Sequence, residues 1–294
     1  MAWAGLGVAA DAVMWLVSAD QSGPYAEAMS ALREGLPGTS LRGLDTADAL
    51  PAGREGTPAL VLTLGNAALR ATLERASADP ALAQVPILAG LLPRASYEAL
   101  QRRGGPPVSG VWLDPVPERH LDLIRLALPE RRRVGVLWGP SSRALRPALQ
   151  KAADERELRL VSAELPALEL FPALSQVLEQ ADVLLALPDS GVYTPASLNN
   201  VLMAAYRQRV PVLGYAAAHV RAGAVLALHT QPQQAGRQLA ALARRVLQER
   251  RVPPPGPSTQ WSVDSNDQVA RSLGLSLPDA ATLAQALQRL ERKP

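Results

Sequence analysis

The most constraining feature of this chain is a pattern of strands and helices that occurs twice. Residues 61–66 are an apolar run that ends in turn residues, followed by a helical stretch and a second apolar run at 85–90. Residues 183–190 and 210–215 repeat this arrangement. Short apolar runs that alternate with helices are typical of parallel strands buried on both faces. The sequence therefore predicts an α/β fold with two doubly wound, parallel-sheet lobes joined by a hinge.

The two lobes account for most of the 294 residues. The first lobe is predicted to comprise residues 1–114 and about 230–260, with strands at 13–18, 40–45, 59–64, 85–90 and 108–113 and helices at 24–35, 66–77, 95–102 and 233–249. The second is predicted to comprise residues 115–229, with strands at 133–138, 158–163, 182–187, 210–215 and 224–228 and helices at 117–128, 141–155, 170–180 and 194–208. Segments 114–117 and 229–232 are the expected hinge crossovers. The C-terminal part is expected to add one short strand at 260–263 and two helices, and residues 261–294 are expected to close the hinge side.

Composition excludes several classes of protein. The net charge is only +3, and Lys151 and Lys293 are the only lysines. The arginines are scattered along helices, whereas a nucleic-acid interface gathers them on one face among aromatic residues. The chain has no cysteine, which excludes thiol catalysis, disulfides and cysteine metal sites. No apolar run reaches the roughly 18 residues of a membrane span. We therefore expect no nucleic-acid partner and no direct membrane insertion.

Motifs of common enzyme classes are missing from the sequence. His120, His219 and His229 lie far apart, and none belongs to an H-x-x-H or H-E-x-x-H ligand pattern. There is no G-x-S-x-G elbow, no G-x-x-x-x-G-K-[ST] phosphate loop and no G-x-G-x-x-G. The expectation is a protein without catalytic residues, bound metal or cofactor.

Short polar side chains follow the predicted strands, at the edge of an open parallel sheet where ligands bind. The candidate ligand-binding residues are Ser18, Asp20, Gln21, Thr63 and Asn66 in the first lobe, and Ser141, Ser142, Asp189, Ser190 and Tyr215 in the second. Hydroxyls and helix N-termini at this edge can hold a carboxylate, and Asp20 or Asp189 can accept an ammonium group. The same residue types are common helix N-caps. The ligand hypothesis therefore depends on their convergence rather than on any one of them.

The N-terminus allows two interpretations. An apolar run at residues 2–10 leads into Ala10-Asp11-Ala12, which matches the A-x-A pattern of a signal-peptidase site. No positively charged segment precedes it. The run is expected to be either the remnant of an export signal or an ordinary apolar N-terminus.

Several short motifs occur in a fixed order along the chain. They read P-V-L at 211–213, V-x-x-G-A at 220–224, G-R-x-x-A at 236–240 and N-x-x-x-A-x-x-L-G-L-x-L-P at 266–278, and Leu128-Pro129 precedes the strand at 133–137. In this order they resemble the substrate-binding proteins of ABC importers, in the subgroup often described as uncharacterised or tryptophan/tyrosine-type. The resemblance extends from about residue 13 to residue 290. It implies a periplasmic binding protein type I fold, a small-molecule ligand held between the lobes, and a membrane permease as partner.

Some loops depart from the pattern of that family. Thr63 and Asp189 match the first residues of its T-x-G-T and D-N loops, whereas Asn66 and Ser190 replace the residues that end them. The family's G-N-x-T-G segment is similar to Gly105–Gly110 here only at its ends. Thr63 and Asp189 are thus the ligand residues that the resemblance implies.

The leading hypothesis is a monomeric, periplasmic solute-binding component of an ABC import system. Its two lobes would close by a hinge motion around a small polar or amphipathic molecule, with amino acids among the candidates. The alternative is a sensory binding protein of the same fold that reports its ligand to a signalling receptor. A two-lobe α/β transferase is a further alternative, which is disfavoured because no catalytic constellation is present.

Overall fold

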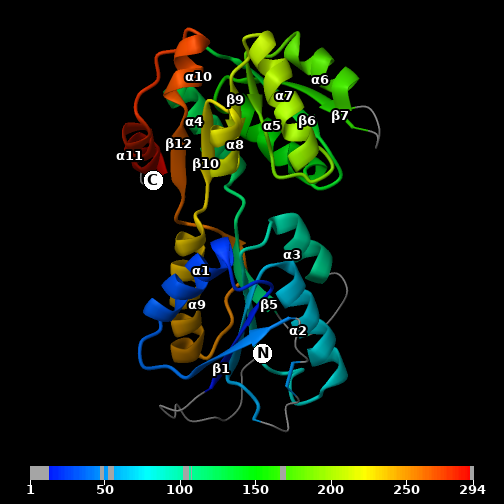
Figure 1. The fold of residues 1–294 in the computed structure, drawn as a ribbon, viewed down its shortest axis with the longest axis vertical. Helices are drawn as coiled ribbons and strands as arrows, with labels where there is room; N and C mark the ends of the chain where they lie inside the picture. The colour runs from blue at the N-terminus through cyan, green and yellow to red at the C-terminus, as the bar shows by residue number, and fades with distance from the viewer. Residues whose placement is uncertain are drawn as a thin grey trace. The chain divides into compact units, whose positions relative to one another are not determined.

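The computed structural model of the protein describes residues 13–46, 50–51, 56–101, 106, 108–165 and 170–291. The chain divides into two compact units (Figure 1). Unit 1 contains residues up to 114 together with 230–260, and unit 2 contains 115–229 together with the residues from 261 onward. The chain therefore crosses between the units at residues 114/115, 229/230 and 260/261. The last of these crossings adds to the two that the sequence suggested.

The sheet of unit 1 has six strands in the order β11-β5-β4-β3-β1-β2, all parallel. They are β1 (Met14–Ser18), β2 (Leu41–Asp45), β3 (Leu60–Leu64), β4 (Ile87–Gly90), β5 (Val108–Trp112) and β11 (Gly256–Pro257). The four central strands are apolar because helices cover both faces. The edge strand β2 is only half buried. The two-residue strand β11 lies in a proline-rich segment and was not predicted.

Four helices cover the sheet of unit 1: α1 (Gly23–Glu34), α2 (Asn66–Ala78), α3 (Arg94–Gln101) and α9 (Pro232–Glu249). Leu60, Leu62 and Leu64 on β3 belong to the core under α1 and α9, while Val61 belongs to the core under α2 and α3. This alternation follows from the period of two along a strand. Helix α9 packs closely on α1, since a Cβ at Gly236 would lie 2.2 Å from the carbonyl oxygen of Ala28.

The sheet of unit 2 has the order β12-β10-β9-β8-β6-β7. Its strands are β6 (Arg133–Trp138), β7 (Arg159–Glu164), β8 (Val183–Leu185), β9 (Val212–Gly214), β10 (Leu226–His229) and β12 (Ser262–Ser265). Its helices are α4 (Pro117–Ala127), α5 (Arg146–Asp154), α6 (Leu170–Leu178), α7 (Pro195–Arg207), α8 (Ala217–Ala222), α10 (Asp267–Ser272) and α11 (Ala280–Glu291), with a 3₁₀ turn at Arg143–Leu145 before α5. All pairings are parallel except that of β12 with β10. Helix α8 was not predicted.

The C-terminal segment is part of unit 2 and not a separate element beside the hinge, contrary to the expectation from the sequence. Strand β12 pairs with β10 over four residues. Leu283 and Leu287 of α11 are buried in the unit 2 core together with Leu121 and Ile124 of α4. A short strand and an amphipathic helix do not reveal their partners in the sequence, because both can pack on any apolar face.

Candidate functional site

The candidate residues lie at the C-terminal ends of the parallel strands in both units. In unit 1, Ser18 and Thr63 lie in the last two residues of β1 and β3, and the other three candidates follow these strands. In unit 2, all five follow β6, β8 and β9. Parallel strands end at one edge of their sheet, so each group of loops gathers at a single edge. Each unit therefore has one polar edge.

Burial separates the ten predicted residues into two groups. Six are exposed or half-buried: Asp20, Gln21, Asn66, Ser141, Ser190 and Tyr215. Four are buried: Ser18, Thr63, Ser142 and Asp189. The first group can touch a ligand directly, whereas the second is suited to hold the loops in shape.

The loop after β1 is stabilised by its own side chains. The Ser18 hydroxyl donates to the carbonyl oxygen of Asp20 at 2.5 Å. The Asp20 carboxylate accepts hydrogen bonds from the amide and the hydroxyl of Ser22, both at 2.9 Å. The hydrogen bond from the Ser22 amide is the largest cause that lowers the pKa of the Asp20 carboxyl. Asp20 is thus an exposed, charged acceptor at the edge of unit 1.

The loop after β3 depends on a glycine. Gly65 has φ +87°, and a Cβ there would lie 2.8 Å from the hydroxyl oxygen of Tyr25. The next residue, Asn66, donates from its side-chain amide to the Ser96 hydroxyl at 3.1 Å and so links the N-termini of α2 and α3. The Thr63 hydroxyl is buried and has no hydrogen-bond partner among the residues that the structure describes. Tyr25 was not predicted as a site residue, because it lies inside α1.

A second feature of this edge was also missed from the sequence. The Arg94 guanidinium at the start of α3 lies 5.6 Å from the ring centroid of Trp112 at the end of β5. Its backbone amide donates to the Asp114 carboxylate at 2.5 Å. Burial raises the pKa of the Asp114 carboxyl. An arginine that opens a helix resembles any surface arginine in sequence, so only the fold places it beside Trp112.

In unit 2, Asp189 joins the loops after β6 and β8. Its side chain is only 2% exposed. One oxygen accepts from the amides of Ser141 at 2.9 Å and Ser142 at 2.7 Å and from the Ser142 hydroxyl at 2.8 Å. The other accepts from the amide of Gly191 at 2.9 Å. Asp189 is not the cap of α7, because Thr194 caps that helix in a capping box with Ser197.

Aromatic side chains lie beside this carboxylate. The ring centroid of the half-buried Tyr215 lies 6.2 Å from that of Tyr193 and 4.3 Å from the ring of His219, both edge-on. Burial lowers the pKa of His219 to about 4, so its imidazole is neutral near pH 7. Burial also raises the pKa of the Tyr193 hydroxyl. The exposed part of this cluster is therefore aromatic and uncharged.

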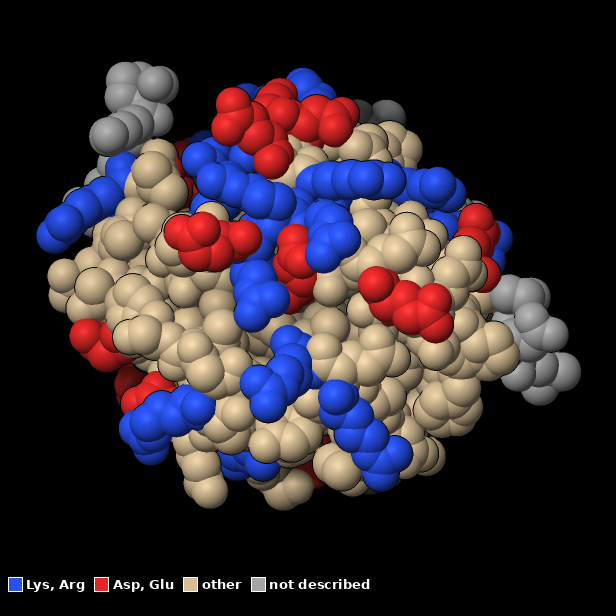
Figure 2. All heavy atoms as spheres, turned by 90° about the horizontal axis from the view of Figure 1, so that it is seen from above, with Lys and Arg blue, Asp and Glu red and all other residues tan. Residues whose placement is uncertain are grey.

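Other kinds of site receive little support from the described part of the chain. Within it, no group of three or more His, Cys, Asp or Glu residues could hold a metal ion. No helix there is long and apolar enough to cross a membrane. On the face shown in Figure 2, arginines and lysines alternate with acidic and uncharged side chains. Some arginines are neutralised by ion pairs, as in Arg133 with Asp182 and Arg156 with Asp122.

The family model for ABC transporter substrate-binding proteins matches residues 98–286. The chain belongs to this family. It is the substrate-binding component of an ABC transporter, and proteins of this family bind solutes and are not enzymes. Its partners are a small-molecule ligand and an ABC permease, and proteins of this family typically act outside the cytoplasm. The motifs from residue 211 to residue 278 lie within the matched range, and the resemblance to substrate-binding proteins of ABC transporters is confirmed at the level of the family.

Solved structures show the same two-lobe fold. A conserved domain protein from Vibrio cholerae O1 biovar El Tor is 22% identical, with a TM-score of 0.60 over 93% of this chain and 97% of that one. A domain from Streptococcus pneumonia in complex with L-Trp is 15% identical, with a TM-score of 0.60 over 94% and 98%. A ligand-free, open substrate-binding protein from Clostridium difficile is 16% identical, with a TM-score of 0.68 over 90% and 96%. A search of curated protein sequences gave no match.

Two of the sequence hypotheses fall on residues without a described structure. The A-x-A pattern at Ala10–Ala12 lies outside the described residues, as do Gly105 and Pro107 of the Gly105–Gly110 segment. The ten candidate ligand residues all lie within the described part of the chain.

Proposed function

We propose that this substrate-binding component captures a small polar or amphipathic solute, with amino acids among the candidates, between its two units. The units close around the solute by hinge motion, and the protein acts as a periplasmic monomer. The observation that carries the proposal is the polar edge that each unit presents at the ends of its parallel strands. Such edges are where open α/β sheets bind ligands.

The exposed groups at these edges suit a ligand with both polar and flat apolar parts. Unit 1 offers the Asp20 carboxylate and the Asn66 amide, next to helix N-termini whose backbone N–H groups favour an anion. Unit 2 offers the hydroxyls of Ser141 and Ser190 and the ring of Tyr215. An ammonium group is best placed on Asp20, because the Asp189 carboxylate is already occupied by four donors.

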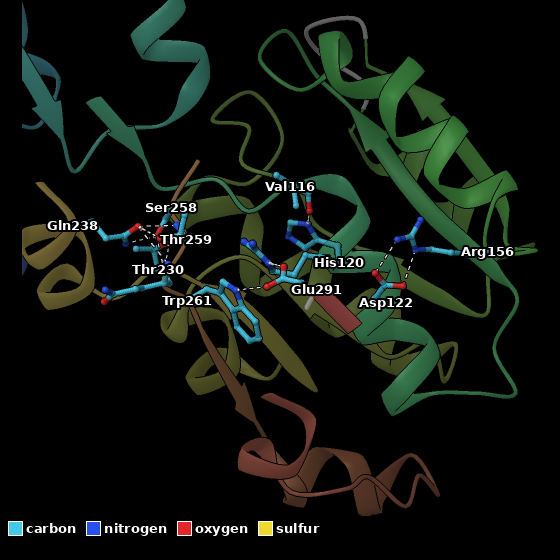
Figure 3. Close-up of polar contacts among 12 residues, drawn as sticks. Val116, His120, Asp122, Arg156, Thr230, Gln238, Ser258, Thr259, Trp261 and Glu291 are labelled. Carbon is cyan, nitrogen blue, oxygen red and sulfur yellow. Dashed lines mark hydrogen bonds and ion pairs between the residues drawn. The ribbon is translucent and has the colours of Figure 1, made fainter. Parts of the chain in front are cut away.

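The chain segments that cross between the units are held on both sides, which supports a localised hinge. In unit 1, the Thr230 hydroxyl is within hydrogen-bond distance of two carbonyl oxygens, 3.2 Å from that of Leu113 and 3.4 Å from that of Gln260. The Gln238 side chain accepts from the Thr259 amide at 2.7 Å (Figure 3). In unit 2, the Trp261 indole donates to Glu291 at 3.3 Å. Hinges are commonly a few residues at the ends of rigid elements.

A thermal-shift screen tests this proposal. Amino acids, including L-tryptophan, would be compared with monosaccharides, nucleosides and short peptides at concentrations up to the millimolar range. A ligand present at 100 times its dissociation constant stabilises the folded state by about 2.7 kcal/mol. The expected result is a raised melting temperature with one chemical class. A uniformly flat screen, with the protein folded, would contradict the proposed ligand class.

A further inference from the structure

Asp189 is the most heavily hydrogen-bonded carboxylate at the polar edge of unit 2. Its two oxygens accept from three backbone amides and one hydroxyl. Oδ2 accepts three of these four hydrogen bonds and Oδ1 accepts one, so both oxygens of the carboxylate are engaged within the protein. A buried charge is costly unless it is hydrogen-bonded in this way. The hydrogen bonds from these donors therefore compensate the cost of burying the negative charge of Asp189.

The donors belong to two loops that are distant in sequence. Ser141 and Ser142 follow β6, whereas Gly191 follows β8. The Ser142 hydroxyl also accepts from the Gly139 amide at 3.0 Å, so it lies between that amide and the carboxylate. The carboxylate thus bridges both loops.

Glycine is required where the loops meet the carboxylate. A Cβ at Gly139 would lie 2.6 Å from both Asp189 oxygens and from the carbon that joins them. A Cβ at Gly191 would lie 3.2 Å from Oδ1 of Asp189 and 3.0 Å from the Pro140 ring. Such close approach shows that the two loops and the carboxylate fit as one packed unit.

We propose that Asp189 is a positioning residue of the ligand site, which holds the loop 139–142 against the loop 189–191 and does not contact a ligand ammonium. Its effect is to fix the half-buried Ser141 and the exposed Ser190 in place before a ligand arrives. Preorganisation of this kind strengthens binding by reducing the cost of ordering the loops. This inference rests on the proposed function for the identity of the site. The hydrogen bonds by which Asp189 holds loops 139–142 and 189–191 together, here called the clamp, lie within unit 2 and do not depend on a ligand.

The structure contains a matched control at the other end of the same strand pair. Asp182, just before β8, accepts hydrogen bonds at one oxygen from the amides of Arg132 at 3.2 Å and Arg133 at 2.9 Å. Its other oxygen accepts from the Arg133 guanidinium at 3.2 and 2.7 Å. Asp182 thus connects the segment before β8 to the start of β6, whereas Asp189 connects the loops after these two strands, at the opposite edge of the sheet. Removing either carboxylate deletes a similar clamp, and only that of Asp189 adjoins the candidate ligand residues.

Amide hydrogen exchange tests the clamp without any ligand. In Asp189→Asn, the remaining amide oxygen can keep the Ser141 and Ser142 donors, while the Gly191 amide loses its acceptor. We expect exchange to accelerate by about tenfold or more at Gly191 in Asp189→Asn, and at Ser142 as well in Asp189→Ala. Asp182→Asn should leave these amides unchanged. Unchanged exchange in both Asp189 variants would overturn the proposal.

Binding of two probes separates positioning from direct contact. L-tryptophan carries an ammonium group, and indole-3-propionate has the same ring and carboxylate without it. A positioning role predicts that Asp189→Asn weakens both probes by the same factor, whereas Asp182→Asn weakens neither. A loss confined to L-tryptophan would show a direct ion pair and overturn the proposal. If neither probe binds the wild-type protein, L-tryptophan is excluded as the ligand, and the exchange measurement still decides whether Asp189 holds the two loops.

A further variant covers the case in which Asp189→Ala does not fold. Ser142→Ala keeps the carboxylate and its three backbone donors but removes the hydroxyl that donates to Asp189 and accepts from the Gly139 amide. Exchange should then accelerate at Gly139 and stay slow at Gly191. Equal acceleration at both amides would mean that the loops open as a whole and that the carboxylate does not hold them separately, which contradicts the clamp.

Discussion

Gly65 holds the turn from β3 into α2 in a conformation that is almost closed to other residues. Its φ of +87° and ψ of 168° lie in a region used essentially only by glycine. Gly274 also has a positive φ, +74°, but a Cβ there would meet nothing within 4 Å. Comparing alanine substitutions at Gly65 and Gly274 therefore separates the cost of backbone strain from the cost of a steric conflict with a neighbouring side chain.

We predict that Gly65→Ala lowers the free energy of unfolding by about 1–3 kcal/mol from backbone strain, with a further loss from the conflict with Tyr25. Gly274→Ala should cost only about 1–2 kcal/mol. Urea unfolding of both variants measures these losses. In a Tyr25→Ala background the cost of Gly65→Ala should be smaller, and an identical cost in both backgrounds would contradict the steric conflict.

His120 makes stability depend on pH. It is 1% exposed, and burial lowers its pKa from the ordinary value of 6.5 to about 4. In the unfolded chain the imidazole takes up a proton near its ordinary pKa, whereas in the folded chain it stays neutral. Its contribution is therefore fully present above pH 6.5 and is lost as the pH falls towards 4.

We predict that the free energy of unfolding falls between pH 8 and pH 5 and that His120 supplies about 2 kcal/mol of that fall. Replacement by leucine removes the titrating group, and Nε2 of His120 has no hydrogen-bond partner within the described residues. Urea unfolding across this range should show a flatter profile for His120→Leu than for the wild type. Parallel profiles would exclude His120 as the cause.

At the scale of elements, a buried arginine contributes to the position of α11, in addition to the apolar contacts of Leu283 and Leu287. Arg119 of α4 is 7% exposed, forms an ion pair with Glu291 and lies 5.2 Å from the ring centroid of Trp261. Arg245 and Glu249 form an exposed pair on α9 at 2.9 Å. Of the Arg119 pair only the arginine is buried, since a third of the Glu291 side chain is exposed. A hydrogen bond to a charged group is worth about 1.5–3 kcal/mol, whereas exposed pairs one helical turn apart give about 0.3–0.5 kcal/mol.

Glu291→Ala is therefore expected to lower the free energy of unfolding by about 1–3 kcal/mol and to loosen α11. Glu249→Ala should change it by less than about 0.5 kcal/mol. Chemical unfolding compares the two variants, and limited proteolysis near residue 291 reports the loosening. Similar small losses in both would show that the Arg119 pair does not hold α11.

The sequence predicted the central elements well because their signal is local. β3 and β6 are apolar runs buried on both faces, and each ends at a turn residue. Elements whose partners are remote were not predictable in the same way. β12 has no apolar run, and its place in unit 2 depends on antiparallel pairing with β10.

The candidate site was likewise predictable only where the signal is local in the sequence. The sequence placed polar residues at strand ends, and the structure brings them to one edge in each unit. It could not distinguish contact from support: Asp189 and Ser190 are neighbours, yet one is 2% exposed and the other is exposed. The bonds that bury Asp189 come from residues 47 and 48 positions away. Short polar residues near turns can cap, brace or bind, and only their three-dimensional neighbours decide which.

At the scale of the whole molecule, substrate binding by hinge closure requires that the crossing segments can move while each unit stays folded. Each unit has its own apolar core on both faces of its sheet. Thr230 reaches carbonyl oxygens of the other two crossing segments, those of Leu113 and Gln260. Loss of this hydroxyl should therefore affect the hinge more than the cores.

We predict that Thr230→Val changes the distribution of open and closed forms in the absence of ligand, with a loss of unfolding free energy of only about 1 kcal/mol. The chain has no native cysteine, so single cysteines at the exposed Arg70 of unit 1 and Gln208 of unit 2 can carry a fluorescent pair. Thr39→Val is the matched control, because the Thr39 hydroxyl also donates to a backbone carbonyl, that of Leu36 at 2.7 Å, but within one unit and away from the crossings. Single-molecule energy transfer should differ from wild type in Thr230→Val and not in Thr39→Val. Identical distributions in all three proteins would show that the Thr230 hydroxyl does not set the hinge equilibrium.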